Sequence, residues 1–322
     1  MPATEPAEPT YLERIEGGLI GLLVGDALGV PYEFHPASQI PPAGQIEYQP
    51  PAGFARSHRG VAPGTWSDDG ALALCLLASL LDRGRLDPDD LGRRFVRWYE
   101  EGYLAVDANV FDIGIQTGQA LRAIKAGVAP LDAGPTEENR LGNGSLMRAL
   151  PLTLWSQDDD ETLIADAMTQ SRLTHGHVRA QVCCALYCLW ARRVLQQQAE
   201  PWADAVDTLR AFWPESSPER AELEFHIRPD DDTPGDGGGY VVATLRSARW
   251  AVESTGDYAS AVRAAIGLGN DTDTTACVAG GVAGLRYGVA SIPQPWRDGL
   301  RGHDLLAPLL ARLLERALEA RP

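Results

Sequence analysis

The sequence has few positive charges, and it has no long uninterrupted apolar run. Its 322 residues hold 28 Lys and Arg against 44 Asp and Glu, a formal net charge of -16, so a nonspecific grip on nucleic-acid phosphates would work against the field of the whole protein. No stretch reaches the roughly 18 consecutive apolar residues of a membrane span, and the first residues lack the basic-then-apolar pattern of a leader. These absences argue against nucleic acid and membrane as partners and predict a cytoplasmic protein.

Cysteine is also scarce, and no two cysteines stand in a CxxC pair. The five of them lie within apolar segments such as "AQVCCALYCLWA": Cys75, Cys183, Cys184, Cys188 and Cys277. This placement favours buried free thiols in a reducing compartment over disulfides or a thiolate metal site.

Alternating strand patterns are nearly absent, whereas apolar residues recur at spacings of three and four. The stripe Leu12, Ile15, Leu19 and Leu22 is one example. Further helices are expected over 72–80, 89–99, 114–125, 160–170, 178–196, 203–212, 241–253, 258–267, 274–286 and 304–319. With 44% hydrophobic residues and no fixed repeat, the chain is predicted to form a compact, single-domain, all-α fold.

We expect the domain to span residues 11–320 after a flexible terminus over 1–10. Two segments rich in Pro and Gly interrupt the helical pattern, at about 36–64 and 214–239. The first is too long for an ordinary connection and is expected to lie near a site. The second holds "PDDDTPGD", which is similar to a calcium loop but lacks the spacing and terminal Glu of an EF-hand, so a solvated loop is favoured.

Two distant stretches share the same order of polar and apolar residues. "GTWSDDGALALCLLASLL" (64–81) places Ser67, Asp68 and Asp69 before a long apolar helix, and "GNDTDTTACVAGG" (269–281) does the same with Asp271, Asp273 and Thr274. Either stretch alone could simply cap a helix. If the two helix starts meet in space, however, they gather four carboxylates, whose charge of about -4 cannot persist in a partly buried cleft without cations.

All these candidate ligands carry hard oxygen atoms, and neither stretch contains a His or Cys ligand beside them. This chemistry suits Mg²⁺ or Mn²⁺ rather than zinc. We therefore predict a binuclear site for two divalent cations at the helix N-termini.

Other motifs are weaker when taken singly. Gly25, Asp26 and Glu33 fall in "GLLVGDALGVPYEF", where the glycine suggests close helix packing, and Asp112 in "FDIGIQTGQAL" could be a helix cap. Asn143, Gly144 and Ser145 could receive a phosphate at a helix start. His175 could be a core histidine, and Tyr240 could belong to the core or offer a stacking surface.

In their order, the motifs GDALGxPxE, GxW[ST]DD, DIGxxT, GNGSxMR, a TH pair, GY and G[GN]DTDT resemble the ADP-ribosylglycohydrolase family, which includes enzymes that reactivate dinitrogenase reductase. The motifs run from about residue 15 to 288. The resemblance implies an all-α fold with two Mg²⁺ or Mn²⁺ ions and hydrolysis of the N- or O-glycosidic bond between ADP-ribose and a protein side chain, commonly arginine.

The same resemblance assigns roles to individual residues. It implies metal ligation by Ser67, Asp68, Asp69, Asp271, Asp273 and Thr274, catalytic roles for Glu33, Asp112 and Asp69, and substrate binding by Asn143, Gly144, Ser145, His175 and Tyr240. Two residues depart from the family's TDDT run: Ser67 keeps the hydroxyl, whereas Gly70 removes one, which suggests weaker metal binding.

The reaction implied is attack of a metal-activated water on the anomeric carbon, with Asp112 or Glu33 managing the proton of the leaving guanidine. The substrate would be an ADP-ribosylated protein, the product ADP-ribose and the enzyme a monomer. Three alternatives stay open at this point: the same chemistry on serine-linked, nucleic-acid-linked or small-molecule ADP-ribose, a two-metal phosphohydrolase, and a catalytically silent protein similar to certain lens crystallins.

Overall fold

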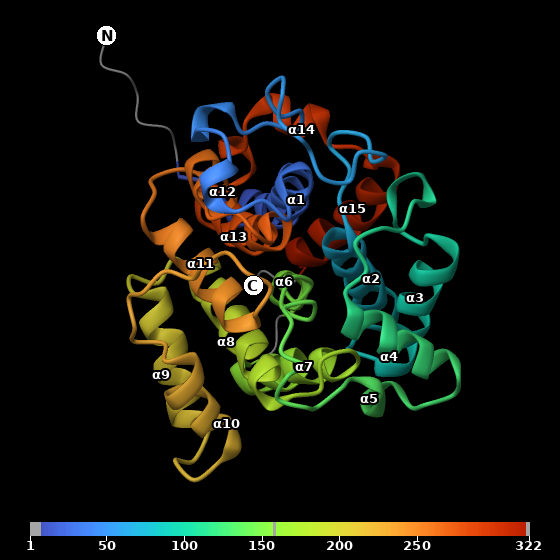
Figure 1. Ribbon diagram of the computed structural model, residues 1–322. Helices are drawn as coiled ribbons and strands as arrows, with labels where there is room; N and C mark the ends of the chain where they lie inside the picture. Colours follow the sequence, from blue (N-terminus) through green and yellow to red (C-terminus); the bar gives the residue numbers. More distant parts are fainter. Residues whose placement is uncertain (1–7, 157–158, 320–322) are drawn as a thin grey trace.

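A computed structural model describes residues 8–156 and 159–319 (Figure 1). These residues form helices joined by turns, with two isolated β-bridges and no named strand. The α-helices are α1 (Tyr11–Gly29), α2 (Asp68–Arg83), α3 (Pro88–Glu101), α4 (Ile115–Lys125), α5 (Pro130–Ala133), α6 (Leu150–Trp155), α7 (Asp160–Arg172), α8 (Val178–Leu195), α9 (Pro201–Phe212), α10 (Pro218–Ala221), α11 (Val241–Glu253), α12 (Tyr258–Gly267), α13 (Thr272–Tyr287), α14 (Gln294–Gly299) and α15 (His303–Glu319).

Shorter helical turns occupy several of the connections between them. They are η1 (Val30–Tyr32), η2 (Ala37–Gln39), η3 (Ala43–Gln45), η4 (Val106–Ala108), η5 (Glu222–Ile227) and η6 (Val289–Ser291). The predicted all-α architecture is confirmed, and the long helices begin and end within a few residues of the positions expected from the apolar spacing.

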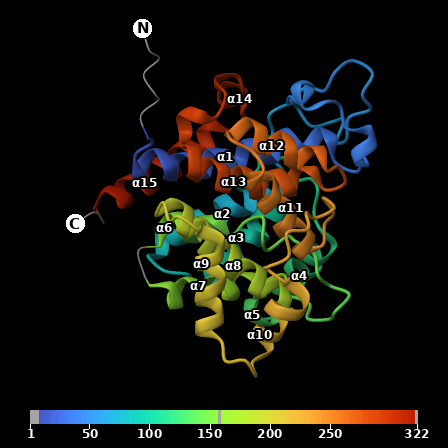
Figure 2. The ribbon, with the colours of Figure 1, turned by 90° about the vertical axis from the view of Figure 1, so that its left-hand side faces the viewer.

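The centre of the fold is an antiparallel pair formed by α1 and α13. Figure 2 shows the two helices side by side across the upper half of the molecule, with α2, α3 and α8 below them. Glycines on α1 face small residues on α13 so closely that a Cβ added to Gly21 would lie 2.5 Å from the Gly280 carbonyl oxygen, and one added to Gly25 would lie 2.1 Å from that of Ala276. The two backbones are therefore in direct contact along several turns.

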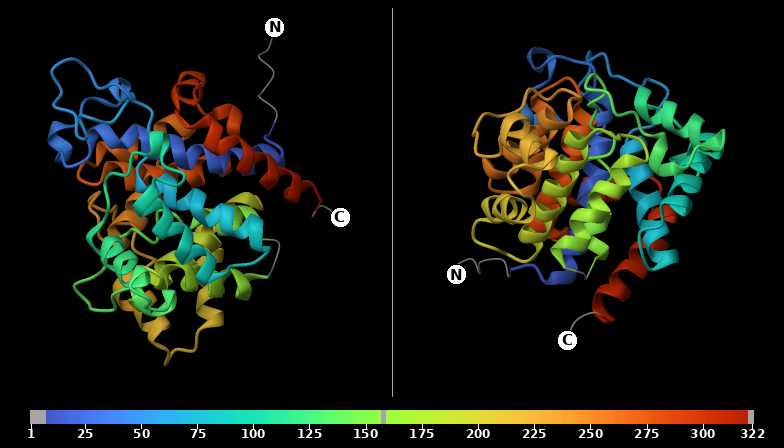
Figure 3. Two further views of the ribbon diagram at one scale, coloured as in Figure 1. Left: turned by 90° about the vertical axis from the view of Figure 1, so that its right-hand side faces the viewer. Right: turned by 90° about the horizontal axis from the view of Figure 1, so that it is seen from below.

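The remaining helices pack around this pair. The helices α11 and α12 contact α13, while α2 packs against α3 and α6, and α8 packs against α7 and α9. Seen from below, segments 88–125 and 201–227 lie on opposite sides of the molecule (Figure 3). All five cysteines are buried and unpaired, as predicted.

The helix α1 is unusually long and apolar. By length and composition, Tyr11–Tyr32 could cross a membrane, but 89% of its most apolar window is buried inside the protein. Its neighbours, above all α13, cover the apolar surface. The stretch is packed as the core helix of a globular domain.

The structure corrects one expectation about the insertions. The segment 214–239, predicted as a loop, contains α10 and η5 because Leu223 and Ile227 turn inward and are fully buried. Its "PDDDTPGD" acids pair with arginines: Asp230 with Arg210 and Asp231 with Arg228. The predicted flexible terminus over 1–10 falls mainly on residues 1–7, outside the described residues, while Thr10 caps α1 in a capping box with Glu13.

Replacing Gly21 by Ala is expected to lower the free energy of unfolding by about 1–3 kcal/mol, because a methyl group has no space beside the Gly280 carbonyl. The melting temperature should fall by roughly 2–10 °C in calorimetry. Gly267→Ala is the matched control, since an added Cβ there meets nothing within 4 Å. Equal melting temperatures for the two variants would contradict the close contact of α1 and α13.

Candidate active site at two helix starts

The two aspartate-bearing helix starts meet at one cavity. Asp68 and Asp69, in the first turn of α2, line it together with Asp271 and Thr274 from the start of α13. The contact of α1 with α13 brings them there, because an added Cβ on Gly29 would lie 2.3 Å from the Asp273 Cα. The hydroxyl of Thr272 also donates to the Gly29 carbonyl at 2.8 Å. The juxtaposition expected from the sequence is thus present in the fold.

The aspartates at these two helix starts do not make the capping hydrogen bonds of their helices. Ser67 is the N-cap of α2, and its hydroxyl accepts the Asp69 N–H at 3.2 Å. Asp271 occupies the N-cap position of α13 but accepts no capping hydrogen bond; its Oδ2 instead accepts the Asn143 side-chain amide at 2.8 Å. The simpler interpretation, that these aspartates serve as helix caps, therefore does not account for them.

Asp26, fully buried on α1, positions the α2 start from outside the helix. Its carboxylate accepts the Ser67 N–H at 3.0 Å and the Gly70 N–H at 2.8 Å. Burial raises the pKa of Asp26 to about 7 in spite of these donors. Asp26 is therefore a positioning residue that fixes the turn carrying Asp68 and Asp69.

Several buried oxygen atoms at the site have no hydrogen-bond partner. They are Asp69 Oδ2 and both carboxylate oxygens of Asp273, a residue with no exposed surface. Burial, reinforced by the neighbouring carboxylates, raises the pKa of Asp68, Asp69 and Asp273 well above the usual range. Unpartnered buried carboxylates of this kind are costly unless a cation binds them.

The donor set fits hard divalent cations. Carboxylate oxygens of Glu33, Asp271 and Asp273 lie within 4.8 Å of one another, and Asp69, Ser67 and Thr274 add oxygen atoms from the same two helix starts. The residues predicted as metal ligands are thus gathered in one place, and the chemistry of the orphaned oxygens matches such ions.

A histidine that the sequence did not reveal lies beside two acidic residues, Glu33 and Asp112, which we call the acidic wall. His58, in the 36–64 loop, places Nε2 2.6 Å from Glu33 Oε2 and 3.9 Å from Asp112 Oδ1. Burial, followed by the charges of Asp112, Asp271 and Asp69, raises the pKa of Glu33 to about 10, while burial lowers the pKa of His58. Both shifts favour the neutral form, and at 2.6 Å the two groups are within hydrogen-bond distance.

The loop around His58 is anchored to the end of α1. The Ser57 N–H donates to the Pro31 carbonyl at 3.0 Å, and the Ser57 hydroxyl donates to the Glu33 carbonyl. The 36–64 loop thus lies beside the candidate site through His58. Its aperiodic path offered no signal for His58 beyond the general expectation that it lies near a site.

The cavity has a volume of about 400 Å³ and is lined by some of the predicted substrate residues as well as by the carboxylates. Asn143, Gly144 and His175 line it. His175 packs so tightly that a Cβ on Gly144 would lie 2.8 Å from its ring, and burial lowers its pKa to about 3, so it is a neutral hydrogen-bonding group. Arg148, also fully buried, donates to the Gly144 carbonyl at 3.0 Å and fixes this turn.

Two predicted substrate residues do not line this cavity. The Ser145 side chain is fully buried, where its hydroxyl accepts hydrogen bonds from Ser171 at 2.8 Å and Cys184 at 3.5 Å. Tyr240, the N-cap residue of α11, lines a neighbouring hollow with Phe225, and its hydroxyl accepts from Arg179 at 3.3 Å. Both lie beside the cavity, because Ser145 follows Gly144 directly and Tyr240 forms a β-bridge with Gly142.

The absence of a side chain at Gly70 also has a structural explanation. A Cβ there would lie 2.7 Å from Leu23 and 2.9 Å from Trp66, so the space of a side chain is filled by the core. At this position the side-chain direction points into the apolar packing between α1 and α2.

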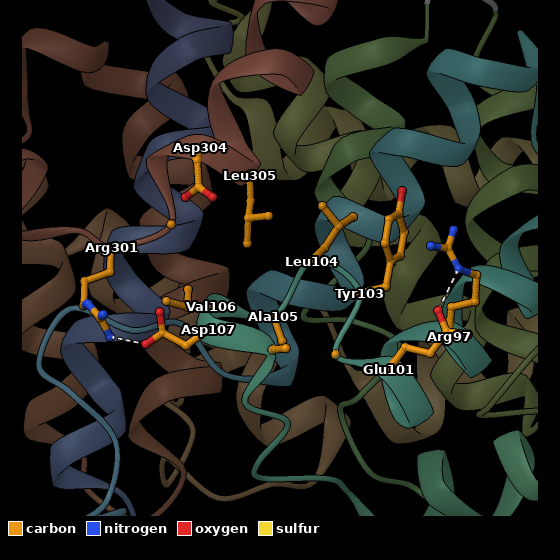
Figure 4. A pocket seen from close by; sticks show the side chains of 13 residues that line it. Arg97, Glu101, Tyr103, Leu104, Ala105, Val106, Asp107, Arg301, Asp304 and Leu305 are labelled. Carbon is orange, nitrogen blue, oxygen red and sulfur yellow. Dashed lines mark hydrogen bonds and ion pairs between the residues drawn. The ribbon is translucent and has the colours of Figure 1, made fainter.

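A larger cavity of about 570 Å³ lies elsewhere, between residues 102–108 and 301–305 (Figure 4). Two ion pairs line it, Arg301 to Asp107 at 2.9 Å and Arg97 to Glu101 at 3.3 Å, and its remaining acid, Asp304, is exposed. It lacks the unpartnered buried carboxylates of the smaller cavity, so its size does not make it the better candidate.

Comparison with known proteins gives a consistent picture. Residues 7–322 match the family profile of ADP-ribosylglycohydrolase. The chain is 30% identical to "ADP-ribosylarginine hydrolase Tri1" of Serratia proteamaculans (strain 568), in an alignment that covers 97% of this chain and 82% of that protein. It is 27% identical to "ADP-ribosyl-[dinitrogen reductase] glycohydrolase" of Rhodospirillum rubrum, covering 91% and 92%. A solved structure described as "ADP-ribosylglycohydrolase-related protein complex" superposes with a TM-score of 0.77 at 30% identity, over 97% of this chain and 99% of that one.

We expect divalent cations to stabilise the protein increasingly as pH rises. The raised pKa of Asp26 means that the folded, metal-free protein holds a proton that the unfolded chain loses above 3.8, so stability falls as pH rises toward about 7. Mg²⁺ or Mn²⁺ binds ionised carboxylates, and burial raises the pKa of the candidate ligands Asp68, Asp69 and Asp273, so the gain in melting temperature on adding either ion should grow as pH rises.

Asp273→Asn is the matched variant for this measurement. It removes one of the crowded charges, so the metal-free melting temperature should rise, while the gain on adding Mg²⁺ or Mn²⁺ should disappear. An equal gain in the variant and the wild type would show that the cations bind elsewhere.

Proposed function

The chain belongs to the ADP-ribosylglycohydrolase family, and from this premise we propose that it hydrolyses the glycosidic bond between ADP-ribose and an arginine side chain of a modified protein, releasing ADP-ribose. The observation that carries the proposal is the set of unpartnered carboxylate oxygens on Asp69 and Asp273, where the starts of α2 and α13 meet. The choice of arginine is supported by two relatives named as ADP-ribosylarginine hydrolases, at 30% and 31% identity.

The cation-binding residues would be Ser67, Asp68, Asp69, Asp271, Asp273 and Thr274, and Glu33 adjoins them. Two divalent cations held there would orient the ribose hydroxyls and supply a water of lowered pKa. The hard-oxygen donor set supports Mg²⁺ or Mn²⁺ as the ions.

The acidic wall would handle the proton of the leaving group. Glu33 is buried and its pKa is raised to about 10, so it holds a proton at neutral pH; cations on the neighbouring carboxylates would bring its pKa down toward the working range. His58 fixes the Glu33 carboxyl by its hydrogen bond at 2.6 Å. Asp112, 3.9 Å from His58 and more exposed than Glu33, provides a second carboxylate between the buried acid and solvent.

Other residues that line the cavity would hold the nucleotide. Asn143, Gly144 and the neutral His175 present polar groups, and Arg140 at the same wall supplies a cation suited to a diphosphate. The Asn143 amide binds Asp271 Oδ2 and Thr244 Oγ1, both at 2.8 Å, so it also orients a candidate metal ligand.

We further propose that the protein acts as a monomer on ADP-ribosylated protein in the cytoplasm. Five buried cysteines without a disulfide among them support a reducing compartment. The net charge of -16 makes nucleic acid a poor primary partner.

Incubation with arginine-linked and serine-linked ADP-ribosyl peptides tests the reaction. Mass spectrometry of the products should show ADP-ribose, released from the arginine-linked peptide with Mg²⁺ or Mn²⁺ and lost with chelator. Asp69→Asn and Asp273→Asn should reduce the rate by at least about 10²-fold through loss of bound cation. Release of AMP would indicate a phosphohydrolase, and release from the serine-linked peptide alone would indicate another linkage. No release from either peptide would indicate a different acceptor or a silent protein.

Replacing His58 by Ala should lower kcat by roughly 10- to 100-fold, because Glu33 loses the group that fixes its carboxyl. His58→Gln, which can still donate one hydrogen bond, should recover part of the rate. His303→Ala, at the exposed start of α15, is the control. If the kcat of His58→Ala matched that of this control, Glu33 would need no such support.

A further inference from the structure

Phe34 is a large aromatic side chain that the fold leaves open beside the catalytic carboxylates. Its side chain is 69% exposed, although it follows the buried Glu33 directly and lines the same cavity. Burial in the core therefore does not explain why an aromatic residue stands here.

The backbone of Phe34 adopts a conformation that disfavours a bulky side chain. Its φ is 62°, in the left-handed region, where a residue of this kind is costly. The conformation is held by two hydrogen bonds with Asn270: the Phe34 N–H donates to the Asn270 carbonyl at 2.7 Å, and the Asn270 N–H donates to the His35 carbonyl at 2.6 Å. Phe34 thus keeps a costly backbone conformation, although its exposed ring gains little stability from burial.

These hydrogen bonds place the ring at a fixed point of the site. Asn270 immediately precedes Asp271, and Pro36 forms a β-bridge with Gly269, so the Phe34 segment is attached to the loop that enters α13. The ring centroid lies 5.6 Å from that of His58, which in turn contacts Glu33 and approaches Asp112. An aromatic face therefore stands next to two carboxylic groups of the cavity, those of Glu33 and Asp112.

An aromatic face beside carboxylates suits a planar cation. A guanidinium stacks on aromatic rings and pairs with carboxylates at the same time, whereas a serine hydroxyl offers neither a plane nor a charge. The net charge of -16 on the whole protein also attracts a cationic group over a longer range.

We propose that Phe34 is a specificity residue on the acceptor side of the cavity, where its ring stacks against the guanidinium of the modified arginine. This inference rests on the proposed function, since it assigns the leaving side chain of that reaction to a particular surface. It assigns different roles to different lining residues: Phe34 contacts the acceptor, while Asn143 and His175 contact the nucleotide.

Steady-state kinetics of Phe34→Ala, Phe34→Leu and Phe34→Trp test the inference. With an arginine-linked peptide, kcat/KM should fall about 2- to 30-fold in the Ala and Leu variants and be retained in the Trp variant, because only Trp preserves an aromatic face. The inhibition constant for free ADP-ribose should stay unchanged in all three. Phe212→Ala, an exposed phenylalanine of α9 outside the cavity, should behave as wild type.

The outcomes separate this inference from the function on which it rests. A parallel rise in the inhibition constant for ADP-ribose would place Phe34 at the nucleotide and overturn the inference. So would a Leu or Ala variant that cleaves the arginine-linked peptide as fast as wild type. A wild-type protein that releases no ADP-ribose from that peptide would instead overturn the proposed function, and the inference with it.

Discussion

The backbone contact between α1 and α13 is the constraint on which the rest of the structure depends. Gly17 meets Gly284, Gly21 meets Gly280 and Gly29 meets Asp273, so the register of the two helices is set by positions that tolerate no side chain. Direct backbone contact leaves little freedom to slide or rotate. Asp26 in the last turn of α1, and Glu33 just after η1, are consequently fixed with respect to the start of α13.

That rigidity supports an electrostatic arrangement which would otherwise be unstable. Carboxylates with raised pKa values are held together because the turns that carry them are secured by other groups: Ser67 and Asp26 satisfy the first amides of α2, and Thr272 attaches α13 to α1. The repulsion among the charges is paid for by core packing elsewhere, as is common at functional sites. The carboxylates are therefore positioned by contacts within the fold itself.

Much of this could be predicted because the decisive signals are local. A helix start is determined by a few consecutive residues. Two such stretches, each with Asp before small apolar residues, indicated a shared site at Asp68, Asp69, Asp271 and Asp273. His58 could not be predicted because it depends on the path of an aperiodic loop. The inward direction of Ser145 depends on how one turn faces the core, which spacing does not encode. The helical turns around Leu223 and Ile227 are too short for periodicity to distinguish them from a loop.

The pairing of α1 with α13 also has a consequence for how the chain is made. An apolar helix near the start of the sequence finds its partner only after more than 240 further residues have been added, as Gly29 and Thr272 show. At about 5–20 residues per second, the interval during synthesis is on the order of tens of seconds. Throughout that time the apolar surface of α1 must be covered by later helices such as α2 and α6, or by a chaperone, before both halves of the site can exist.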